Sequence, residues 1–136
     1  AVNRNGIALE HASEELCADK EVVLEAVRQC GWALDYASED LRSDEQVVLE
    51  ATKEDGEAFG FASELLRANR DIVLQAVRSS GDALKHAVDN LRADREIVTE
   101  AIRYFGPAWL YADVALQADK EILLLAARSL REDDTY

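Results

Sequence analysis

The chain repeats one pattern of 25 residues along its length, in five units at 1–25, 26–50, 51–75, 76–100 and 101–125. When the slots of the pattern are numbered from Ala1, slot 1 of each unit holds alanine, slot 6 glycine and slot 16 leucine. A fixed period of roughly 20–50 residues is typical of repeat proteins, in which each unit buries its apolar face only by stacking on its neighbours. The period therefore predicts the architecture before any single motif is considered.

We expect a single all-α domain over 1–136, an α-solenoid of short helix-turn-helix repeats whose hand, right or left, the sequence leaves open. A terminal helix and tail are expected at 119–136. Hydrophobic residues make up 49% of the chain, which is a globular rather than a disordered composition. The chain holds no methionine and opens in the middle of a unit, which indicates an excerpt of a longer protein.

The formal net charge of −13 argues against nucleic acid and against anionic membrane surfaces as partners. It suits a partner with a basic surface, although an acidic surface also serves solubility alone. No apolar run approaches the roughly 20 residues of a membrane helix, and no signal-peptide pattern is present. Cys17 and Cys30 fit no metal spacing, and a helix separates them, so we expect two reduced thiols in an intracellular protein, with the compartment open.

Each unit is predicted to form two helices of about 11 residues. In the segment from Asp44 to Gly56, Asp44 suits the N-cap of the first helix, and Gly56 is expected to end it in a left-handed conformation. An apolar stripe lies between them, at Val47, Val48, Ala51 and Thr52. The second helix is expected over 57–67. Alanines at slots 8 and 12 of every unit predict a close approach of neighbouring helices.

No catalytic, cofactor or metal site is predicted. His11 and His86 share slot 11 with aromatic residues of other units, which favours half-buried packing over metal binding. Slot 19 holds aspartate in four units but Asn69 in the third, and asparagine caps a helix as well as aspartate does but is no acid or base. The slot therefore indicates capping rather than carboxylate catalysis. Phosphate-binding, hydrolase and calcium-binding motifs are absent from the sequence, so we expect no enzyme.

The fifth unit carries apolar residues at slots that are mostly polar elsewhere, and these are the candidate partner-binding residues: Tyr104, Phe105, Pro107, Leu110, Val114 and Leu125. They lie beside Trp109, which replaces an apolar residue of the other units. Exposed apolar patches mark interfaces, and aromatic residues are common in binding hot spots. The alternative is that the terminal helix, or chain beyond Tyr136, covers the patch. Trp32 is a second candidate, with shielding of a helix turn as its alternative role.

The recurring string is close to D-x-E-V-V-L-x-A-V-x-x-x-G-x-A-L-x-x-A-S-x-x-L-R, as residues 19–42 show. The chain resembles a tandem-repeat domain family of unknown function, common in algae and other protists and found in some effectors of intracellular bacteria. The resemblance is weaker in the fifth unit, where Asp113 and Gln117 replace serine and arginine. It implies a repeat scaffold and carries no activity to any residue.

We therefore expect a non-catalytic protein–protein interaction or scaffold module, an accessory part of a larger assembly. The alternative is a partner-recognition module attached to a catalytic domain outside the chain. The partner, its identity and the oligomeric state are left open by the sequence.

Overall fold

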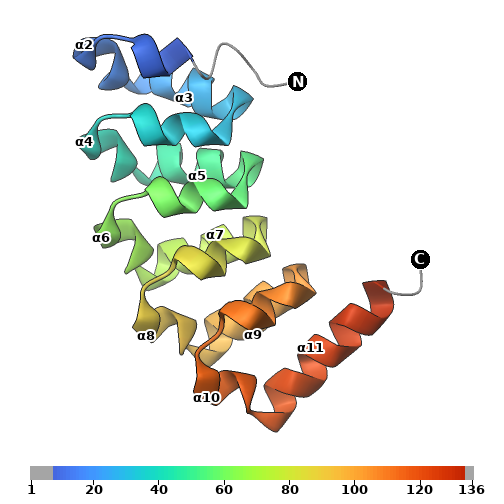
Figure 1. Cartoon of the computed structure of the whole chain (residues 1–136). Helices are drawn as coiled ribbons and strands as arrows, with labels where there is room; N and C mark the ends of the chain where they lie inside the picture. Colours follow the sequence, from blue (N-terminus) through green and yellow to red (C-terminus); the bar gives the residue numbers. More distant parts are fainter. Residues whose placement is uncertain (1–7, 134–136) are drawn as a thin grey trace.

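A computed structural model describes the backbone of residues 8–133 and the side chains of residues 9–130. Every element in that part of the chain is helical, as the all-α prediction requires (Figure 1). Four α-helices of ten residues and a final one of 14 form one layer of a stack. These long helices are α3 (Lys20–Gln29), α5 (Glu45–Glu54), α7 (Arg70–Ser79), α9 (Arg95–Tyr104) and α11 (Lys120–Asp133).

Ahead of each long helix the chain forms a 3₁₀-helix and then a one-turn α-helix. The 3₁₀-helices are η1 (Ala8–His11), η2 (Gly31–Tyr36), η3 (Gly56–Phe61), η4 (Gly81–His86) and η5 (Gly106–Tyr111). The one-turn helices are α2 (Glu14–Cys17), α4 (Glu39–Arg42), α6 (Glu64–Arg67), α8 (Asp89–Arg92) and α10 (Val114–Gln117). The prediction of one continuous helix over 57–67 is therefore wrong, because η3 and α6 divide that segment.

The break has a physical cause in the hydrogen bonds between units. Ala62 and Ser63 are extended, with ψ of 154°, and the Ser63 N–H donates to the Arg42 carbonyl oxygen of the preceding one-turn helix at 2.9 Å. The same bond recurs from Ser38 to Cys17, from Val88 to Arg67 and from Asp113 to Arg92. A continuous helix would use these N–H groups internally, so the chain breaks the helix to link neighbouring units.

The prediction of a left-handed Gly56 is also wrong. The residue after α5 is Asp55, which is extended with φ of −154°, and no residue of the described part has a positive φ. The glycine slot serves a close approach instead. A Cβ on Gly81 would lie 2.7 Å from the Ala101 carbonyl oxygen of the next long helix, which is closer than real Cβ contacts come.

The predicted N-caps are confirmed. The Asp44 side chain accepts the Val47 N–H at 3.1 Å, and Asn69 accepts the Ile72 N–H at 3.2 Å in the same way. Each bond satisfies one of the amide donors that the first helical turn leaves unpaired. Asn69 performs the capping role of the aspartates, as the sequence indicated.

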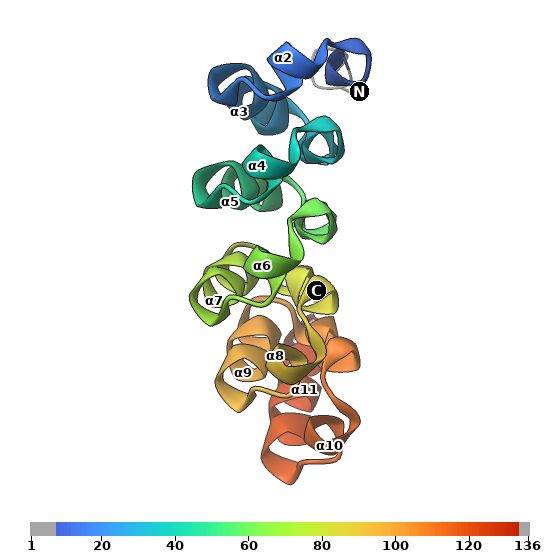
Figure 2. The same ribbon diagram turned by 90° about the vertical axis from the view of Figure 1, so that its left-hand side faces the viewer.

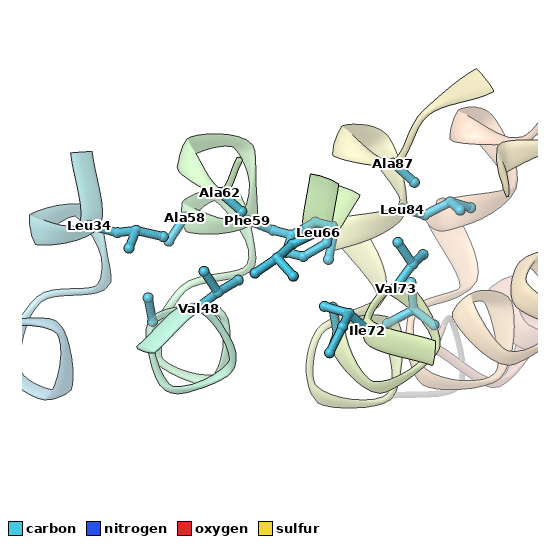
Figure 3. Packing of buried hydrophobic residues seen from close by; sticks show 14 of the residues in the cluster. Leu34, Val48, Ala58, Phe59, Ala62, Leu66, Ile72, Val73, Leu84 and Ala87 are labelled. Atoms are coloured by element: carbon cyan, nitrogen blue, oxygen red, sulfur yellow. The ribbon is translucent and has the colours of Figure 1, made fainter. Parts of the chain in front are cut away.

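The core lies between the layer of long helices and the layer of 3₁₀-helices. Val48 and Val73 of the long helices point toward Phe59 and Leu84 of the 3₁₀-helices, and all four are fully buried (Figure 3). The slot-8 alanine Ala58 is also fully buried, as a residue packed between neighbouring helices would be. The one-turn helices run along one edge of the stack, where Figure 2 shows them facing the viewer.

Candidate partner-binding surfaces

We call the contact between one long helix and the next a joint. A row of ion pairs crosses these joints where the long helices begin. Lys20 contacts Asp44 at 3.0 Å, and Arg70 contacts Asp94 and Glu96, both at 2.8 Å. At the last joint, the Arg95 guanidinium repeats the pattern with Asp119 and Glu121, both at 2.9 Å. We call this row the cation ladder.

The aspartates of the cation ladder are also helix caps, and the pKa values of Asp94 and Asp119 reflect both roles. The hydrogen bond from Arg70 holds the pKa of Asp94 below its ordinary value. The hydrogen bond from Arg95, with the Ile122 N–H, lowers the pKa of Asp119 to about 2. Charged donors favour the ionised carboxylate, so the ladder binds each cap to the preceding unit.

At the second joint of the chain, between α5 and α7, both the ladder cation and its carboxylate partner are replaced by other residues. Glu45 occupies the slot that holds a cation in the other long helices, and Asn69 occupies the slot of its carboxylate partner. Two carboxylates would repel each other at this position. The neutral asparagine keeps the cap and removes the repulsion at slot 19, while slot 21 of the same helix still holds a carboxylate, Asp71.

A second row of ion pairs crosses the joints near the opposite end of the long helices. Arg78 contacts Glu100 at 3.1 Å, and Arg28 contacts Glu50 at 3.6 Å. At the last joint Leu125 stands in the place of the glutamate. Leu125 is half-buried and packs against the core, so it offers a partner only part of its side chain.

The candidate residues of the fifth unit lie in two groups rather than in one patch. Tyr104 and Phe105 lie where α9 meets η5, with exposed fractions of 60% and 37%, and the half-buried Pro107 follows them. Leu110 and Val114 lie where η5 meets α10, and their exposed fractions are 62% and 76%. The length of η5, roughly 12 Å at the usual rise of a 3₁₀-helix, separates the groups.

Trp109 and Gln117 link η5 to α10 in the fifth unit. The Trp109 indole donates to the Gln117 carbonyl oxygen at 3.3 Å. In the four preceding one-turn helices, the equivalent oxygen accepts the N–H of the next unit. Gln117 also donates to the carbonyl oxygen of Ala112 at 3.1 Å, as Arg67 does to Ala62. The side chain of slot 17 thus closes the end of the 3₁₀-helix, a role that the sequence analysis missed.

Trp32 forms a contact between two units. Its indole donates to Asp55 at 2.7 Å, and its ring meets the Phe61 ring edge-on with centroids 5.1 Å apart. Both contacts reach into the following unit, although 49% of the Trp32 surface stays exposed. Trp32 therefore helps to hold two units together, and about half of its side chain is still accessible to a partner.

Leu65 is an exposed apolar residue that the sequence analysis did not single out. It lies on α6 with an exposed fraction of 73%, at a slot that holds glutamate, aspartate, asparagine or alanine in the other units. A comparison of slot 15 across the units would have found it. Acidic residues surround this position on the edge formed by the one-turn helices, which we call the short-helix edge. The exposed acids of this edge are Glu14, Glu15, Glu39, Asp40, Glu64, Asp89 and Asp113.

His86 of the fourth unit, at slot 11, packs against its neighbours as the sequence predicts for this slot. His86 is half-buried, with its Nε2 atom 3.3 Å from Glu57, and Lys85 donates to the same carboxylate at 2.9 Å. The Lys85 hydrogen bond lowers the pKa of Glu57. A Cβ on Gly60 would lie 2.8 Å from the His86 ring, so the glycine there makes room for the ring. His11, by contrast, is exposed.

Between residues 8 and 133, no group of three or more histidine, cysteine or acidic side chains is arranged to hold a metal ion. Cys17 and Cys30 are both unbridged thiols. The Cys17 thiol donates to the Leu9 carbonyl oxygen at 3.5 Å and to the Ala12 carbonyl oxygen at 3.9 Å. The contact with Ala12 corresponds to the bonds that Arg67 and Gln117 make to Ala62 and Ala112. In the same part of the chain, none of the helices has the length and apolarity required to cross a bilayer.

Three consecutive stretches of the chain, residues 1–42, 44–92 and 94–130, match the model of a domain of unknown function, DUF4116. The chain belongs to this family. The boundaries between the DUF4116 matches fall at Ser43 and Ala93, each directly before a capping aspartate, so one match spans about two of the 25-residue units. No curated protein and no solved structure matches the chain.

Proposed function

We propose that this DUF4116 chain is a protein-binding module, an α-solenoid whose variable slots contact a protein partner with a basic or apolar surface. The observation that carries the proposal is the exposure of Leu110 and Val114 on adjoining elements. Slot 14 holds an acid in all the other units, and slot 10 holds no apolar residue in them. Large apolar side chains that gain nothing from burial within the chain are typical of binding surfaces.

The charge of the short-helix edge supports a basic partner. Val114 and Leu65 lie on this edge among the exposed acidic residues, so an approaching cationic surface meets apolar anchors inside a negative field. Such complementarity raises association rates and selects partners, while apolar anchors supply most of the affinity. In this proposal the module is a non-catalytic, accessory part of a larger assembly.

The test uses a reversion to the repeat pattern. The double variant Leu110→Asp/Val114→Glu places in the fifth unit the residues that the second unit carries at the same slots, Asp35 and Glu39. All of these positions are exposed, so circular dichroism should show an unchanged fold. Affinity capture with crosslinking, quantified by mass spectrometry, should show at least one partner that binds the wild type and is lost from the reversion variant.

A matched control separates specific binding from general stickiness. The variant Asp35→Leu/Glu39→Val places the apolar pair on the second unit and leaves the fifth unit intact. It should keep the partner that the reversion loses, and proteins captured by this variant alone are non-specific. An identical set of partners for the wild type and the folded reversion variant would refute the proposal.

A further inference from the structure

The one-turn helices follow one another along the short-helix edge at a regular step. At every step from the first unit to the fifth, the N–H of slot 13 donates to the slot-17 carbonyl oxygen of the preceding unit, at 2.9–3.2 Å. Figure 2 shows α2, α4, α6, α8 and α10 in succession down the stack. Packed helices lie roughly 8–10 Å apart, so each feature of this edge recurs at that interval.

Grooves open between successive one-turn helices of the edge. One of about 620 Å³ lies between α2 and the second unit, and one of about 280 Å³ lies between α8 and the fifth unit. Slots 14 and 17 of one unit and slot 13 of the next line both grooves: Glu14, Cys17 and Ser38 in the first, and Asp89, Arg92 and Asp113 in the second. Each groove is bounded by two described units, so it belongs to the side of the stack rather than to an end.

Slot 14 holds an acid in each of the first four units. These exposed acids are Glu14, Glu39, Glu64 and Asp89. In the part of the chain that the structure describes, Asp89 alone among them has an ion-pair partner, Arg92. The one-turn helix does not need the acid, because α10 forms with Val114 at the same slot. The row of carboxylates is therefore available to a cationic ligand.

Two large apolar side chains stand in line with these acids. Leu65 follows Glu64 directly, and Val114 occupies slot 14 at the end of the row. They are the two most exposed large apolar side chains of the described residues. A ligand of this edge thus meets both negative charge and apolar surface. Lysine and arginine suit such a surface, because each combines a positive charge with an apolar stem.

The step of the edge matches an extended polypeptide. Three residues span roughly 9–10 Å, since each advances about 3.1 Å in polyproline II and about 3.3 Å in a strand. An α-helix is roughly 10–12 Å across with its side chains, as wide as a whole step, so it does not fit into a groove between two units.

We propose that the grooves of the short-helix edge bind an extended segment of the partner in which a lysine or arginine recurs at every third residue. Each cation then meets the slot-14 acid of one unit, and the backbone of the segment follows the stack from groove to groove. This inference rests on the proposed function, because it specifies which part of the partner meets Val114 and the acids.

Three synthetic peptides of identical composition test the spacing. Each contains lysine, proline and serine in equal numbers, with one lysine for each acid of slot 14, and proline favours the extended polyproline II conformation. The matched peptide has a lysine at every third residue. The two comparison peptides have their lysines at every second residue or in one block. Fluorescence anisotropy of the labelled peptides should show that the matched peptide binds the wild-type chain most tightly, and that added salt weakens its binding.

A pair of variants tests the location. Glu39→Gln/Glu64→Gln removes two carboxylates from the middle of the row, and the control Glu25→Gln/Glu54→Gln removes two that line neither groove. All four residues are exposed, so circular dichroism should show that both variants fold. The edge variant should bind the matched peptide roughly 2–30-fold more weakly than the wild type, the range expected for the loss of two exposed ion pairs. The control should lose much less, since salt screens distant charges.

Three results would overturn the inference. A comparison peptide that binds as tightly as the matched one would mean that attraction by charge alone, without a fixed spacing, explains the binding. An equal loss in the two variants would place the binding outside the grooves. Absence of binding by all the peptides would mean that the edge does not take an extended basic segment. In each case the proposed function still stands if the reversion variant loses a captured partner, and it fails if no partner is lost.

Discussion

The joint between α7 and α9 and the joint between α9 and α11 share the cation ladder and differ at their other end. In both, the first residue of the leading helix, Arg70 or Arg95, bonds two carboxylates at the start of the next helix. At the far end, Arg78 reaches Glu100 across the interior joint, while Leu125 stands in the acceptor's place at the last one. Both of these joints keep the ladder, whereas the last one replaces the acceptor of the second row with Leu125. The α5–α7 joint, with Glu45 and Asn69, stacks with the ladder cation and its slot-19 acceptor both replaced, so stacking does not require that pair at every joint.

The same two joints differ in how tightly the layers approach. A Cβ on Gly81 would lie 2.4 Å from the Cβ of Phe105, whereas the nearest atom to a Cβ on Gly106 is the Ser129 Cβ at 3.0 Å. The last joint is looser at its glycine slot than the joint before it. The looser joint is also the one that carries Leu125 in place of the glutamate.

The largest effect is expected from a substitution that disrupts the packing of the joint between α7 and α9. Gly81→Ala should lower the free energy of unfolding by about 1–3 kcal/mol, because the new Cβ overlaps Phe105 and the Ala101 carbonyl oxygen. Gly106→Ala should cost much less, since its neighbour can shift by a few tenths of an ångström. Urea denaturation of both variants measures the difference, and equal losses would show that the two joints are packed alike.

The next effect concerns the slot-17 side chains. Arg67→Met and Gln117→Met each remove a donor to the end of a 3₁₀-helix, and each should lower the free energy of unfolding by about 1 kcal/mol. Arg42→Met is the matched control, because the Nε atom of Arg42 is buried without a hydrogen-bond partner. The same urea experiment applies, and an equal loss in the control would mean that packing of the long side chain, not the bond, matters.

A smaller effect is expected from the charge of Asp119. Asp119→Asn should keep the cap, as Asn69 does, but lose the contact with Arg95, so its melting temperature should be below that of the wild type at pH 7. The pKa of Asp119 is lowered to about 2 in the folded chain, from an ordinary value of about 4. The stabilisation is therefore complete above pH 4 and is lost as the pH falls toward 2. Thermal melts should show the two proteins converging near pH 2, and a difference that is independent of pH would contradict this account.

The period, the caps and the buried stripe could be predicted because each depends on residue types at fixed spacing within one unit. Asp44 caps α5, and Val47, Val48 and Thr52 are buried as their spacing indicates. The break after η3 could not be predicted, because it depends on a hydrogen bond between Ser63 and the preceding unit. Local propensity describes one helix, whereas this bond arises only in the stack.

The candidate partner-binding residues also include features that the sequence predicts and features that it does not. The slot comparison predicted Leu110 and Val114 as unusual, and they are exposed. It treated them as one patch with Tyr104 and Phe105, whereas these two residues lie at the other end of η5. The compensation of Glu45 by Asn69 was accessible from the sequence, since it needs only the period and the signs of the charges, but its meaning depends on knowing which slots face each other.

The central claim is that all joints are one packing arrangement, so that contacts can be moved from one joint to another. The double-mutant cycle of Glu45→Arg and Asn69→Asp tests it most directly, because it builds at the second joint the ladder pair seen between Arg70 and Asp94. Urea denaturation of the wild type, both single variants and the double variant should give a favourable coupling free energy of roughly 0.2–1 kcal/mol, as expected for an exposed ion pair. Strictly additive effects would contradict the claim, because they would mean that these two slots do not face each other across the joint as they do elsewhere.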